Sequence, residues 1–517
     1  MSNEKFSSKG GFILASIGAS VGLGNALRFP GLCAQYGGGA FLLIYVIALI
    51  VLGVPLLNAE IALGRRTGGG SPKCLASVLK ERRKKLGKGL GWASCINSTF
   101  TALIYAGLAG WIIATAILIV PLSLSAGNLS KEEISGYFFN NVLSARNDGV
   151  IDGFSPIVAV CIVLAWVLMY FCLRGGAKTL SKSAKFTVII PLVLLTCLAV
   201  RGLMYSNAPQ ALSVLFIPDF TKLSSPQLWL TALGQVFFSL SIVVGIMPVY
   251  GSYLPAGSNV FKCSAVIALA DLSVSVLASV VLFTTLYGCG LEGSIGASGI
   301  ITAFAIYPVA ITRLFGDFAV LNGIVGVLFY SSLAMMAIQS AVSMLEAFLN
   351  PLSEEYSKPK KTIAKWVCLC GIPLTMLYST TCAPVAVDVS DRFINFYNVL
   401  ILGVAECLIL GRNTTPQTLA EEINKFSKKL KMPARGFKIS IKYLSPAVLS
   451  SLTLYEFLRL ILNGLDYPLW LQLLFGWFLS LAVFGIPFIL LRERRFRPRC
   501  HSERPQCHSE RSEESPR

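Results

Sequence analysis

Residues 18 to 25 read Gly18-Ala19-Ser20-Val21-Gly22-Leu23-Gly24-Asn25, and Arg28-Phe29-Pro30 follows closely within the same apolar segment. Each glycine inside a helix costs about 1 kcal/mol relative to alanine, and backbone groups freed in a bilayer need other partners. A charge such as Arg28 at that depth costs about 2.5–3.5 kcal/mol more. A glycine-rich packing face would explain the glycines but neither Asn25 nor Arg28. The pattern therefore predicts a broken membrane helix that lines a cavity or binds a ligand.

The composition is that of a membrane protein with many spans. Hydrophobic residues make up 54% of the 517 residues and charged residues only 14%, and about 20 apolar residues suffice to cross a bilayer as a helix. We therefore expect an all-α polytopic membrane protein with about twelve transmembrane helices. The expected spans, within a few residues, are 12–34, 38–63, 93–121, 155–173, 183–206, 227–253, 260–289, 318–349, 363–384, 392–411, 440–463 and 467–491.

The positive charge alternates from one connection to the next. The formal net charge is +18, yet the connections between the basic ones carry few Lys or Arg residues. The basic connections are 64–91, 174–185, 354–365, 412–442 and 492–499. Under the positive-inside rule this alternation predicts a multi-pass protein of the plasma (inner) membrane with both termini in the cytoplasm. It favours contact with membrane lipid over nucleic-acid binding as the reason for the charge.

The usual signatures of catalysis are missing from the sequence. Fourteen cysteines are scattered without a disulfide or metal-binding spacing, and both histidines, His501 and His508, lie near the C-terminus. The sequence has no Gly-x-x-x-x-Gly-Lys-Ser/Thr loop for nucleotide phosphates. We expect no enzymatic activity, and we interpret residues 492–517 as a basic, low-complexity cytoplasmic tail.

A second interrupted span lies near the middle of the chain. It reads Gln235-Val236-Phe237-Phe238-Ser239-Leu240-Ser241-Ile242-Val243-Val244-Gly245-Ile246-Met247-Pro248, with glycine and proline among hydroxyl and amide side chains. Spans one and six correspond when ten helices form two halves of five, and an odd number per half inverts the second half. Broken helices at matching positions of inverted repeats point to the substrate site of a secondary transporter. The predicted units are 1–206 (helices 1–5), 207–435 (helices 6–10), 436–491 (helices 11 and 12) and the tail.

Three N-terminal motifs resemble the neurotransmitter:sodium symporter family, to which the bacterial leucine transporter and the monoamine and GABA carriers belong. They are the stretch from Gly18 to Pro30, Tyr36-Gly37-Gly38-Gly39-Ala40-Phe41, and Gly53-Val54-Pro55-Leu56 leading to Glu60. The resemblance runs from about residue 4 to residue 490, and the short second extracellular connection is similar to the prokaryotic branch. It implies a carrier that moves a small amine or amino acid inward with sodium by alternating access.

The resemblance implies a substrate site at the two breaks. The N–H groups of Leu23 and Gly24 would bind a carboxylate at the end of a half-helix, and Tyr105 resembles the family tyrosine that binds the same group. Gly22 stands where monoamine carriers have an aspartate, which implies an amino acid as substrate. The side-chain pocket would be apolar and include Val243, so we expect small-to-medium neutral amino acids such as alanine, valine, leucine or methionine. The implied substrate-binding residues are Ser20, Leu23, Gly24, Thr101, Tyr105, Phe238, Ser239, Ser241, Val244, Ser340 and Met344.

Two sodium sites are implied in the same way, and both offer the oxygen ligands that a hard cation requires. The implied ligands of the first are Ser20, Asn25, Ser239 and Asp271, and those of the second are Gly18, Val21, Met336, Gln339 and Ser340. Gln339 replaces the threonine that is usual in the family. Because its longer side chain holds its oxygen less firmly, we expect the second site to bind sodium more weakly.

Asp271 also bears on chloride. In chloride-dependent relatives the equivalent residue is an asparagine, and the chloride ligands there correspond to Tyr45, Gln235, Ser239 and Ser275. Two negative charges about 5 Å apart at an effective dielectric of about 20 repel each other by roughly 3 kcal/mol. We therefore expect that chloride is not required. The Asp271 carboxylate would balance the charge of sodium, or take up a proton and couple that instead.

Gates on both sides of the substrate are the last feature that the resemblance implies. Arg28 and Asp391 would pair on the outer side, with Phe238 as an aromatic lid beside Tyr105. Glu354 and Tyr253 would act on the inner side. Lys5 or Lys9 would substitute there for the family's N-terminal arginine, whose place is taken by Asn3.

These observations favour a sodium-coupled symporter that takes up a small neutral amino acid. Two alternatives stay open on the sequence. One is a proton-coupled or exchange-mode amino-acid carrier of the same fold, and the other is a sensor or binding protein of this fold that does not transport. Uptake driven by a sodium gradient separates them, since a sensor binds its ligand without accumulating it.

Overall fold

The computed structural model describes residues 5–146, 148–291, 299–413, 416–427 and 431–492. Within these ranges the chain forms helices joined by loops, and the β structure consists of two isolated bridges, Gly38 with Pro218 and Phe154 with Thr380. The expected all-α membrane fold is thus confirmed. The tail from residue 493 and the N-terminal Asn3, for which sequence predictions were made, lie outside the described residues.

Ten described helical segments are long and apolar enough to cross a membrane, and an eleventh is a bent pair. The ten run Gly39–Thr67, Glu81–Asn128, Pro156–Leu173, Gly176–Leu203, Val260–Gly288, Ala319–Tyr356, Lys360–Ser379, Ala383–Asn413, Ala434–Asn463 and Leu469–Leu491. The helices within them are α3 (Gly39–Ala48), α4 (Val54–Thr67), α6 (Lys84–Ser125), α8 (Pro156–Leu173), α9 (Gly176–Leu203), α13 (Val260–Gly288), α16 (Ala319–Tyr356), α17 (Lys360–Thr375), α18 (Ala383–Asp391), α19 (Val399–Asn413), α21 (Ala434–Ile439), α22 (Ser445–Asn463), α23 (Leu469–Leu471) and α24 (Leu479–Arg492).

The first span is broken at the predicted glycines. Helix α1 (Lys9–Ser20) ends before Val21, a short π-helical segment η1 (Gly24–Arg28) follows, and α2 (Phe29–Gln35) completes the span. The two halves are bent by 53°. The carbonyl groups in the last turn of α1 therefore carry the negative end of the helix dipole into the middle of the protein.

The sixth span is broken as well. Helix α11 (Pro226–Ser239) and helix α12 (Ile246–Ser252) are each too short to span, and residues 240–245 connect them. Three residues of this connection have positive φ, namely Ser241 at 52°, Val243 at 73° and Gly245 at 79°. Positive φ is a rare and strained conformation for a β-branched residue such as Val243. Fully buried Glu60 of α4 supports it, because its Oε1 accepts a hydrogen bond from the Val243 N–H at 2.5 Å.

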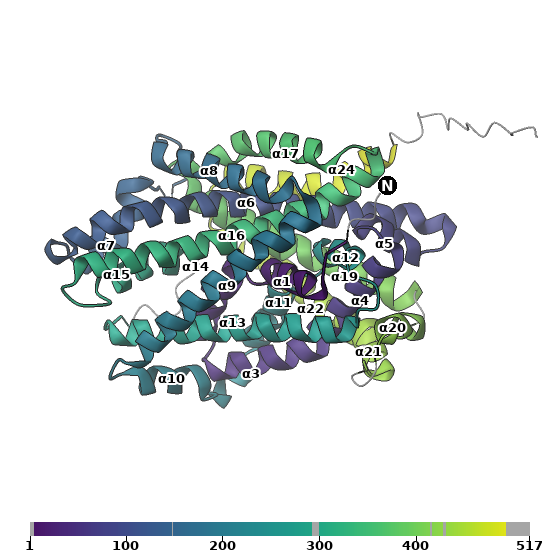
Figure 1. Ribbon diagram of the computed structural model, residues 1–517, viewed down its shortest axis with the longest axis horizontal. Coiled ribbons are helices and arrows are strands. Elements are labelled where there is room, and N and C mark those ends of the chain that lie inside the picture. The colour runs from purple at the N-terminus through teal and green to yellow at the C-terminus, as the bar shows by residue number, and fades with distance from the viewer. Residues whose placement is uncertain (1–4, 147, 292–298, 414–415, 428–430, 493–517) are drawn as a thin grey trace, which may run out of the picture.

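The connections separate to two ends of the molecule. Figure 1 shows α5 (Ser71–Val78), α20 (Pro416–Asn424) and α21 at the same end as the N-terminus. Helices α7 (Lys131–Tyr137), α10 (Ala208–Phe216) and α15 (Tyr307–Thr312) lie at the opposite end. Helices from two of the basic connections expected in the cytoplasm, 64–91 and 412–442, therefore lie at one end.

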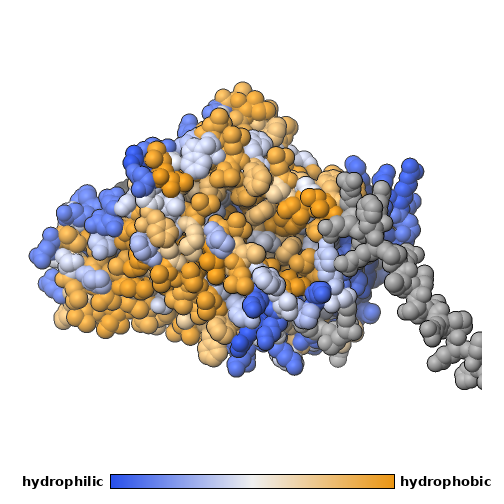
Figure 2. Space-filling view, turned by 90° about the horizontal axis from the view of Figure 1, so that it is seen from above, coloured by the Kyte–Doolittle hydropathy of each residue, from blue (hydrophilic) through white to orange (hydrophobic). Residues whose placement is uncertain are grey.

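An apolar belt covers the side of the molecule between these ends. In Figure 2 hydrophobic residues dominate the middle of the visible surface, whereas hydrophilic ones gather toward its two ends. Large apolar side chains such as Val160, Met204, Leu269 and Phe488 are 64% to 75% exposed. A surface of this kind is stable in contact with lipid acyl chains, as expected for a multi-pass membrane protein.

Candidate functional site

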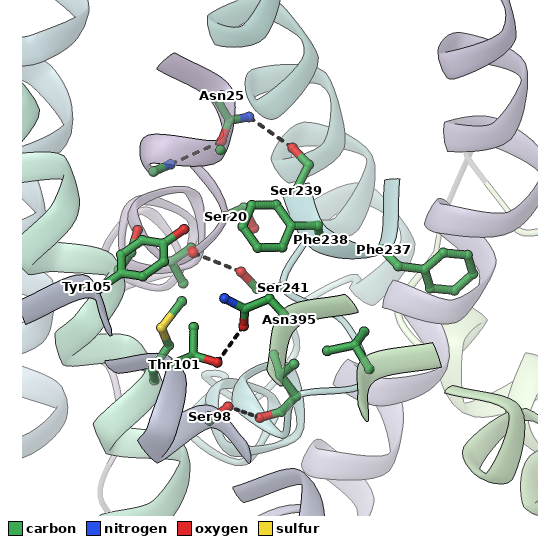
Figure 3. Close-up of a pocket in the computed structure, with 17 residues that line it drawn as sticks. Ser20, Asn25, Ser98, Thr101, Tyr105, Phe237, Phe238, Ser239, Ser241 and Asn395 are labelled. Atoms are coloured by element: carbon green, nitrogen blue, oxygen red, sulfur yellow. Dashed lines mark hydrogen bonds between the residues drawn. The ribbon is translucent and has the colours of Figure 1, made fainter. Parts of the chain in front are cut away.

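A small cavity of about 30 Å³ lies where the two broken spans meet. Figure 3 shows its polar side chains converging from several helices, with Tyr105 on one side and Phe238 above Ser241 and Asn395. A cavity of this volume holds one or two water molecules, so an amino acid would have to widen it. Its lining residues are Ala19, Ser20, Gly22, Gly24, Asn25, Ser98, Thr101, Tyr105, Phe237, Phe238, Ser239, Ser241, Val244, Ser340, Met344, Asn395 and Val399.

The structure brings nearly all the substrate-binding residues expected from the sequence to this cavity. The exception is Leu23, which lines a separate outer cavity. Val243 is also absent from the lining, because its N–H faces Glu60 and its side chain packs near Gly403 of α19. Its neighbour Val244 lines the cavity instead. Val243 has a positive φ of 73°, whereas Val244 is not among the residues with positive φ.

Three residues separate the cavity from an outer vestibule of about 400 Å³: Gly24, Tyr105 and Phe238 line both spaces. A Cβ at Gly24 would lie 2.5 Å from Cε1 of Phe238, so the phenyl ring packs directly on the glycine backbone. The Phe238 ring lies in turn under Arg28, whose guanidinium carbon is 4.7 Å from the ring centroid. The Phe238 ring therefore forms a lid that packs on Gly24 on one side and on Arg28 on the other.

Arg28 and Asp391, the expected outer gate, both line the outer vestibule. Among the described residues the structure records no ion pair between them. Arg28 stacks on Phe238, while Asp391 Oδ1 accepts a hydrogen bond from Asn395 Nδ2 at 2.8 Å. The two opposite charges therefore face a common space in which they can approach each other.

Asn395 is a cavity residue that the sequence analysis missed. It lies in the π-helical segment η10 (Arg392–Asn398), and its Oδ1 accepts from Thr101 Oγ1 at 2.6 Å (Figure 3). Since its Nδ2 donates to Asp391, one amide connects the cavity wall to the outer gate. The position of Asn395 four residues after Asp391 on a helix is the only sequence signal that could have indicated it.

The expected first sodium site is centred on Asn25, which is fully buried. Asn25 Oδ1 accepts from the N–H of Gly22 at 3.0 Å, across the break of the first span. Its Nδ2 donates to Ser239 Oγ, to Asp271 Oδ1 and to Ser275 Oγ at 2.7 to 3.0 Å. Asn25 thus joins both broken spans to α13.

The carboxylate of buried Asp271 accepts hydrogen bonds from two of the four side chains that the resemblance assigns to chloride. Tyr45 Oη donates to Asp271 Oδ2 at 3.1 Å and Ser239 Oγ donates to the same oxygen at 2.7 Å. Gln235 lies nearby and donates to the carbonyl of Gly24 at 3.4 Å. Two of the four side chains that would hold an anion, Tyr45 and Ser239, are therefore directed at a carboxylate of the chain itself.

The residues expected at the second sodium site lie between α1 and α16. A Cβ at Gly18 would lie 2.9 Å from Cγ of Gln339, and one at Gly22 would lie 2.4 Å from Oγ of Ser340, so glycines permit this close contact. Met336, Gln339 and Ser340 are all buried. The Gln339 amide also contacts α9, where its Oε1 lies 3.2 Å from Ser183 Oγ and 3.0 Å from Thr187 Oγ1.

On the inner side, Tyr253 belongs to a cluster of polar side chains. Its hydroxyl contacts Glu346, Lys360 and Asn350, and Lys360 Nζ forms an ion pair with Glu346 Oε1 at 2.8 Å. Neither Glu346 nor Lys360 was singled out from the sequence. Both sit one or more helical turns from Glu354, on α16 and α17.

Glu354 lines the same inner cavity as Tyr253, with a volume of about 900 Å³. Lys9, one of the two lysines expected to act with it, donates instead to the carbonyl of Gly257 at 3.4 Å. Phe6 fills the space above, with its ring 5.7 Å from that of Tyr253 and 5.8 Å from that of Tyr250. Phe6, Tyr250 and Tyr253 therefore form an aromatic cluster beside the inner cavity, which Tyr253 lines.

Comparison with known proteins gives consistent similarities. The Sodium:neurotransmitter symporter family matches residues 3–126 and 120–495. An uncharacterized sodium-dependent transporter of Methanocaldococcus jannaschii is 29% identical over 505 residues, which cover 96% of this chain and 99% of the relative. The sodium-dependent serotonin transporter of Drosophila melanogaster is 26% identical over 88% of this chain and 76% of its own. The crystal structure of MhsT in complex with L-phenylalanine has the same fold, with a TM-score of 0.71, 24% identity and coverage of 87% of this chain and 99% of MhsT.

Proposed function

The chain belongs to the Sodium:neurotransmitter symporter family, and from that premise we propose that it takes up a small neutral amino acid with sodium by alternating access. Sodium-coupled symport is the activity common to the family. The proposal adds the substrate class and the direction of transport. It also includes two inverted five-helix repeats, 1–206 and 207–435, and both termini in the cytoplasm.

The observation that carries the proposal is the meeting of two broken spans at one closed cavity. Ser20 and Gly24 come from the first break, Ser241 and Val244 from the second, and all four line the same space. Unwound backbone inside a membrane protein is stable only where it lines a cavity or binds something. The N–H groups at the start of a half-helix suit a carboxylate, and Tyr105 offers a hydroxyl beside them.

The substrate class follows from the rest of the lining. Phe237, Val244, Met344 and Val399 are apolar, and the polar groups Thr101 and Asn395 are bonded to each other. This lining presents no charged side chain that could pair with the side chain of a lysine, arginine, aspartate or glutamate substrate, whose burial would be costly. The small volume favours alanine, valine, leucine or methionine over tryptophan. MhsT, with which this chain shares its fold, was crystallised with an amino acid.

Sodium would bind at two places beside the cavity. Asn25, Ser239, Asp271 and the Ser20 carbonyl supply oxygens for the first site. Gly18, Val21 and Met336 would contribute carbonyls to the second, with the side chains of Gln339 and Ser340. The dipole of α1 favours a cation at its C-terminal end, where Gly18 and Ser20 lie.

Asp271 supports transport without chloride. Its carboxylate already accepts from Tyr45 and Ser239, so an anion would lose these donors and meet a like charge. Alternatively, the buried Asp271 carboxyl group could bind a proton and would then no longer supply the negative charge that balances sodium. Proton coupling is therefore the second candidate, and it rests on this residue alone.

A binding screen tests the proposal. Purified protein is heated with each of the twenty amino acids, in sodium and in choline buffer, and the unfolding temperature is recorded. A ligand that binds the native state raises it by an amount set by concentration over Kd. We expect stabilisation by small neutral amino acids that depends on sodium. Stabilisation by charged amino acids or tryptophan alone would contradict the substrate class.

A further inference from the structure

The side-chain amide of Gln339 is buried, and its oxygen has hydrogen-bonding partners whereas its nitrogen has none. Its Oε1 lies within hydrogen-bonding distance of Ser183 Oγ and Thr187 Oγ1 on α9, while its Nε2 is buried without a partner. A buried N–H pair without an acceptor is destabilising, because it has lost its hydrogen bonds to water. The neighbouring Ser340 Oγ is also buried and without a partner. Two adjacent side chains on α16 thus hold unused polar atoms opposite the end of α1.

The two α9 hydroxyls have more acceptors within reach than protons. Ser183 Oγ also lies 3.0 Å from the carbonyl of Leu180, and Thr187 Oγ1 lies 3.1 Å from the carbonyl of Ser183. A hydroxyl donates one hydrogen bond and accepts two. When both protons go to the α9 carbonyls, both hydroxyls are left as acceptors that face the Gln339 amide.

An amide turned by 180° about its last bond gives both α9 hydroxyls a donor and leaves its oxygen, in place of its nitrogen, without a partner. Its oxygen and nitrogen ends have nearly the same shape. The two N–H bonds of the turned amide meet two hydroxyl acceptors, Ser183 and Thr187. The carbonyl oxygen then takes the unpartnered position, on the opposite side from α9. A cation is the natural partner for an oxygen there, beside Ser340 Oγ and the C-terminal end of α1.

Building on the second sodium site of the proposed function, we propose that Ser183 and Thr187 are positioning residues. Their hydroxyls accept hydrogen bonds from the Gln339 amide nitrogen and thereby orient the amide oxygen toward sodium. The α9 hydroxyls restrict the rotation of the long Gln339 side chain. The shorter threonine side chain that is usual in the family has less freedom to rotate and needs no such partners. The second site is then not weakened by the replacement of the usual threonine. It also gains a connection to α9 that a threonine would not make.

Removing a group that hydrogen-bonds a metal ligand typically changes the affinity for the metal by 10-fold to 100-fold. We therefore expect Thr187→Val, and Thr187→Val with Ser183→Ala, to raise the sodium concentration for half-maximal binding of the amino acid about tenfold. The control is Thr196→Val on the same helix, since the Thr196 hydroxyl bonds the carbonyl of Leu192 and is exposed. It should leave the sodium dependence unchanged.

A double-mutant cycle with Gln339→Thr separates positioning from a general effect of α9. A threonine at 339 ligates sodium without help from α9, so adding Thr187→Val and Ser183→Ala to Gln339→Thr should change the sodium dependence less than twofold. The readouts are binding of labelled amino acid and the rise of unfolding temperature with sodium alone, both on the full-length protein in nanodiscs. Binding at saturating sodium shows that each variant is folded.

Three results overturn the inference. Thr187→Val and the double variant with wild-type sodium dependence would show that α9 does not position Gln339. An equal loss with Gln339 and with Thr at position 339 would assign the effect to α9 itself. A wild type whose binding ignores sodium altogether would overturn the proposed function as well, which distinguishes the two failures.

Discussion

Gly24 has no side chain, and Phe238 occupies the space that one would fill. A Cβ there would lie 2.5 Å from Cε1 and 3.0 Å from Cδ1 of the ring. Gly24→Ala should therefore push the lid away from the cavity, and overpacking of this kind costs about 1–3 kcal/mol. We expect the Kd of the amino acid to rise on the order of tenfold or more. The control is Gly485→Ala, because nothing lies within 4 Å of a Cβ at Gly485. Unchanged affinity in Gly24→Ala would contradict the lid.

Asp391 distinguishes two roles by its substitutions. As a gate it needs its charge to meet Arg28, whereas as an acceptor for Asn395 it needs only an oxygen. A charge left partly desolvated and unpaired costs about 3–5 kcal/mol where it is buried. We expect Asp391→Asn, Asp391→Ala and Arg28→Ala all to lose transport while the protein still inserts. Rescue by the reversed pair would support the gate. Full transport by Asp391→Asn would reduce Asp391 to a partner of Asn395.

Residues next to a motif could be predicted, and residues across helices could not. Asn25, Arg28 and Glu60 belong to one contiguous stretch with a recognisable pattern of glycines. Asn395 and the Gln339 partners are different, because Ser183 and Gln339 are 156 positions apart. The contacts of Gln339 depend on how α9 and α16 cross, and the contact of Asn395 with Thr101 depends on how η10 lies against α6. The period of apolar residues specifies neither. Val243 failed for a local reason, since one positive φ turned its side chain away.

At the scale of the element, the connection 240–245 is stable because α4 supports it. Glu60 accepts from the Val243 N–H, and without this bond a buried donor would be unpaired in a strained turn. The sixth span was predicted to break from its glycine and proline. The sequence alone did not show that a carboxyl group of the second span would hold the break in place.

Two substitutions of Glu60 test this support. Glu60→Gln keeps an oxygen that accepts from Val243, whereas Glu60→Ala leaves the donor unpaired at a cost of about 1–3 kcal/mol. We expect Glu60→Ala to lower the unfolding temperature and abolish binding, and Glu60→Gln to retain most of both. Thermal unfolding in detergent and binding of labelled amino acid give the comparison. Equal loss in the two variants would mean that the charge of Glu60 matters more than its hydrogen bond.

At the scale of the whole molecule, the fold was predictable because each span is recognisable as an apolar segment of sufficient length in the sequence. Twelve apolar segments were expected, and the described residues form ten long helical segments, a bent first span and a sixth span split into α11 and α12. Neither broken span contains one continuous helix long enough to cross a membrane. Both were nevertheless recognisable in the sequence from their apolar composition. The opening of the outer and inner gates, in contrast, is a difference between two conformations of the whole protein.

The charge of the transported ions is also a property of the whole cycle. Asp271 places a carboxylate against two of the donors that would hold chloride, so we expect uptake in gluconate to equal uptake in chloride. Asp271→Asn removes the charge and should make uptake chloride-stimulated or abolish it. Uptake is measured for both proteins in the two anions at external pH 5.5 to 8.5. A wild type that requires chloride would contradict the charge argument.

Accumulation against a gradient is the most direct test of a sodium-coupled uptake carrier. The amino acid found in the binding screen is offered, radiolabelled, to proteoliposomes with an inward sodium gradient, an inward proton gradient or neither. We predict accumulation above the external concentration with the sodium gradient alone, and its collapse when sodium is equalised across the membrane. Accumulation driven by protons without sodium, or sodium-dependent binding without any accumulation, would contradict the account.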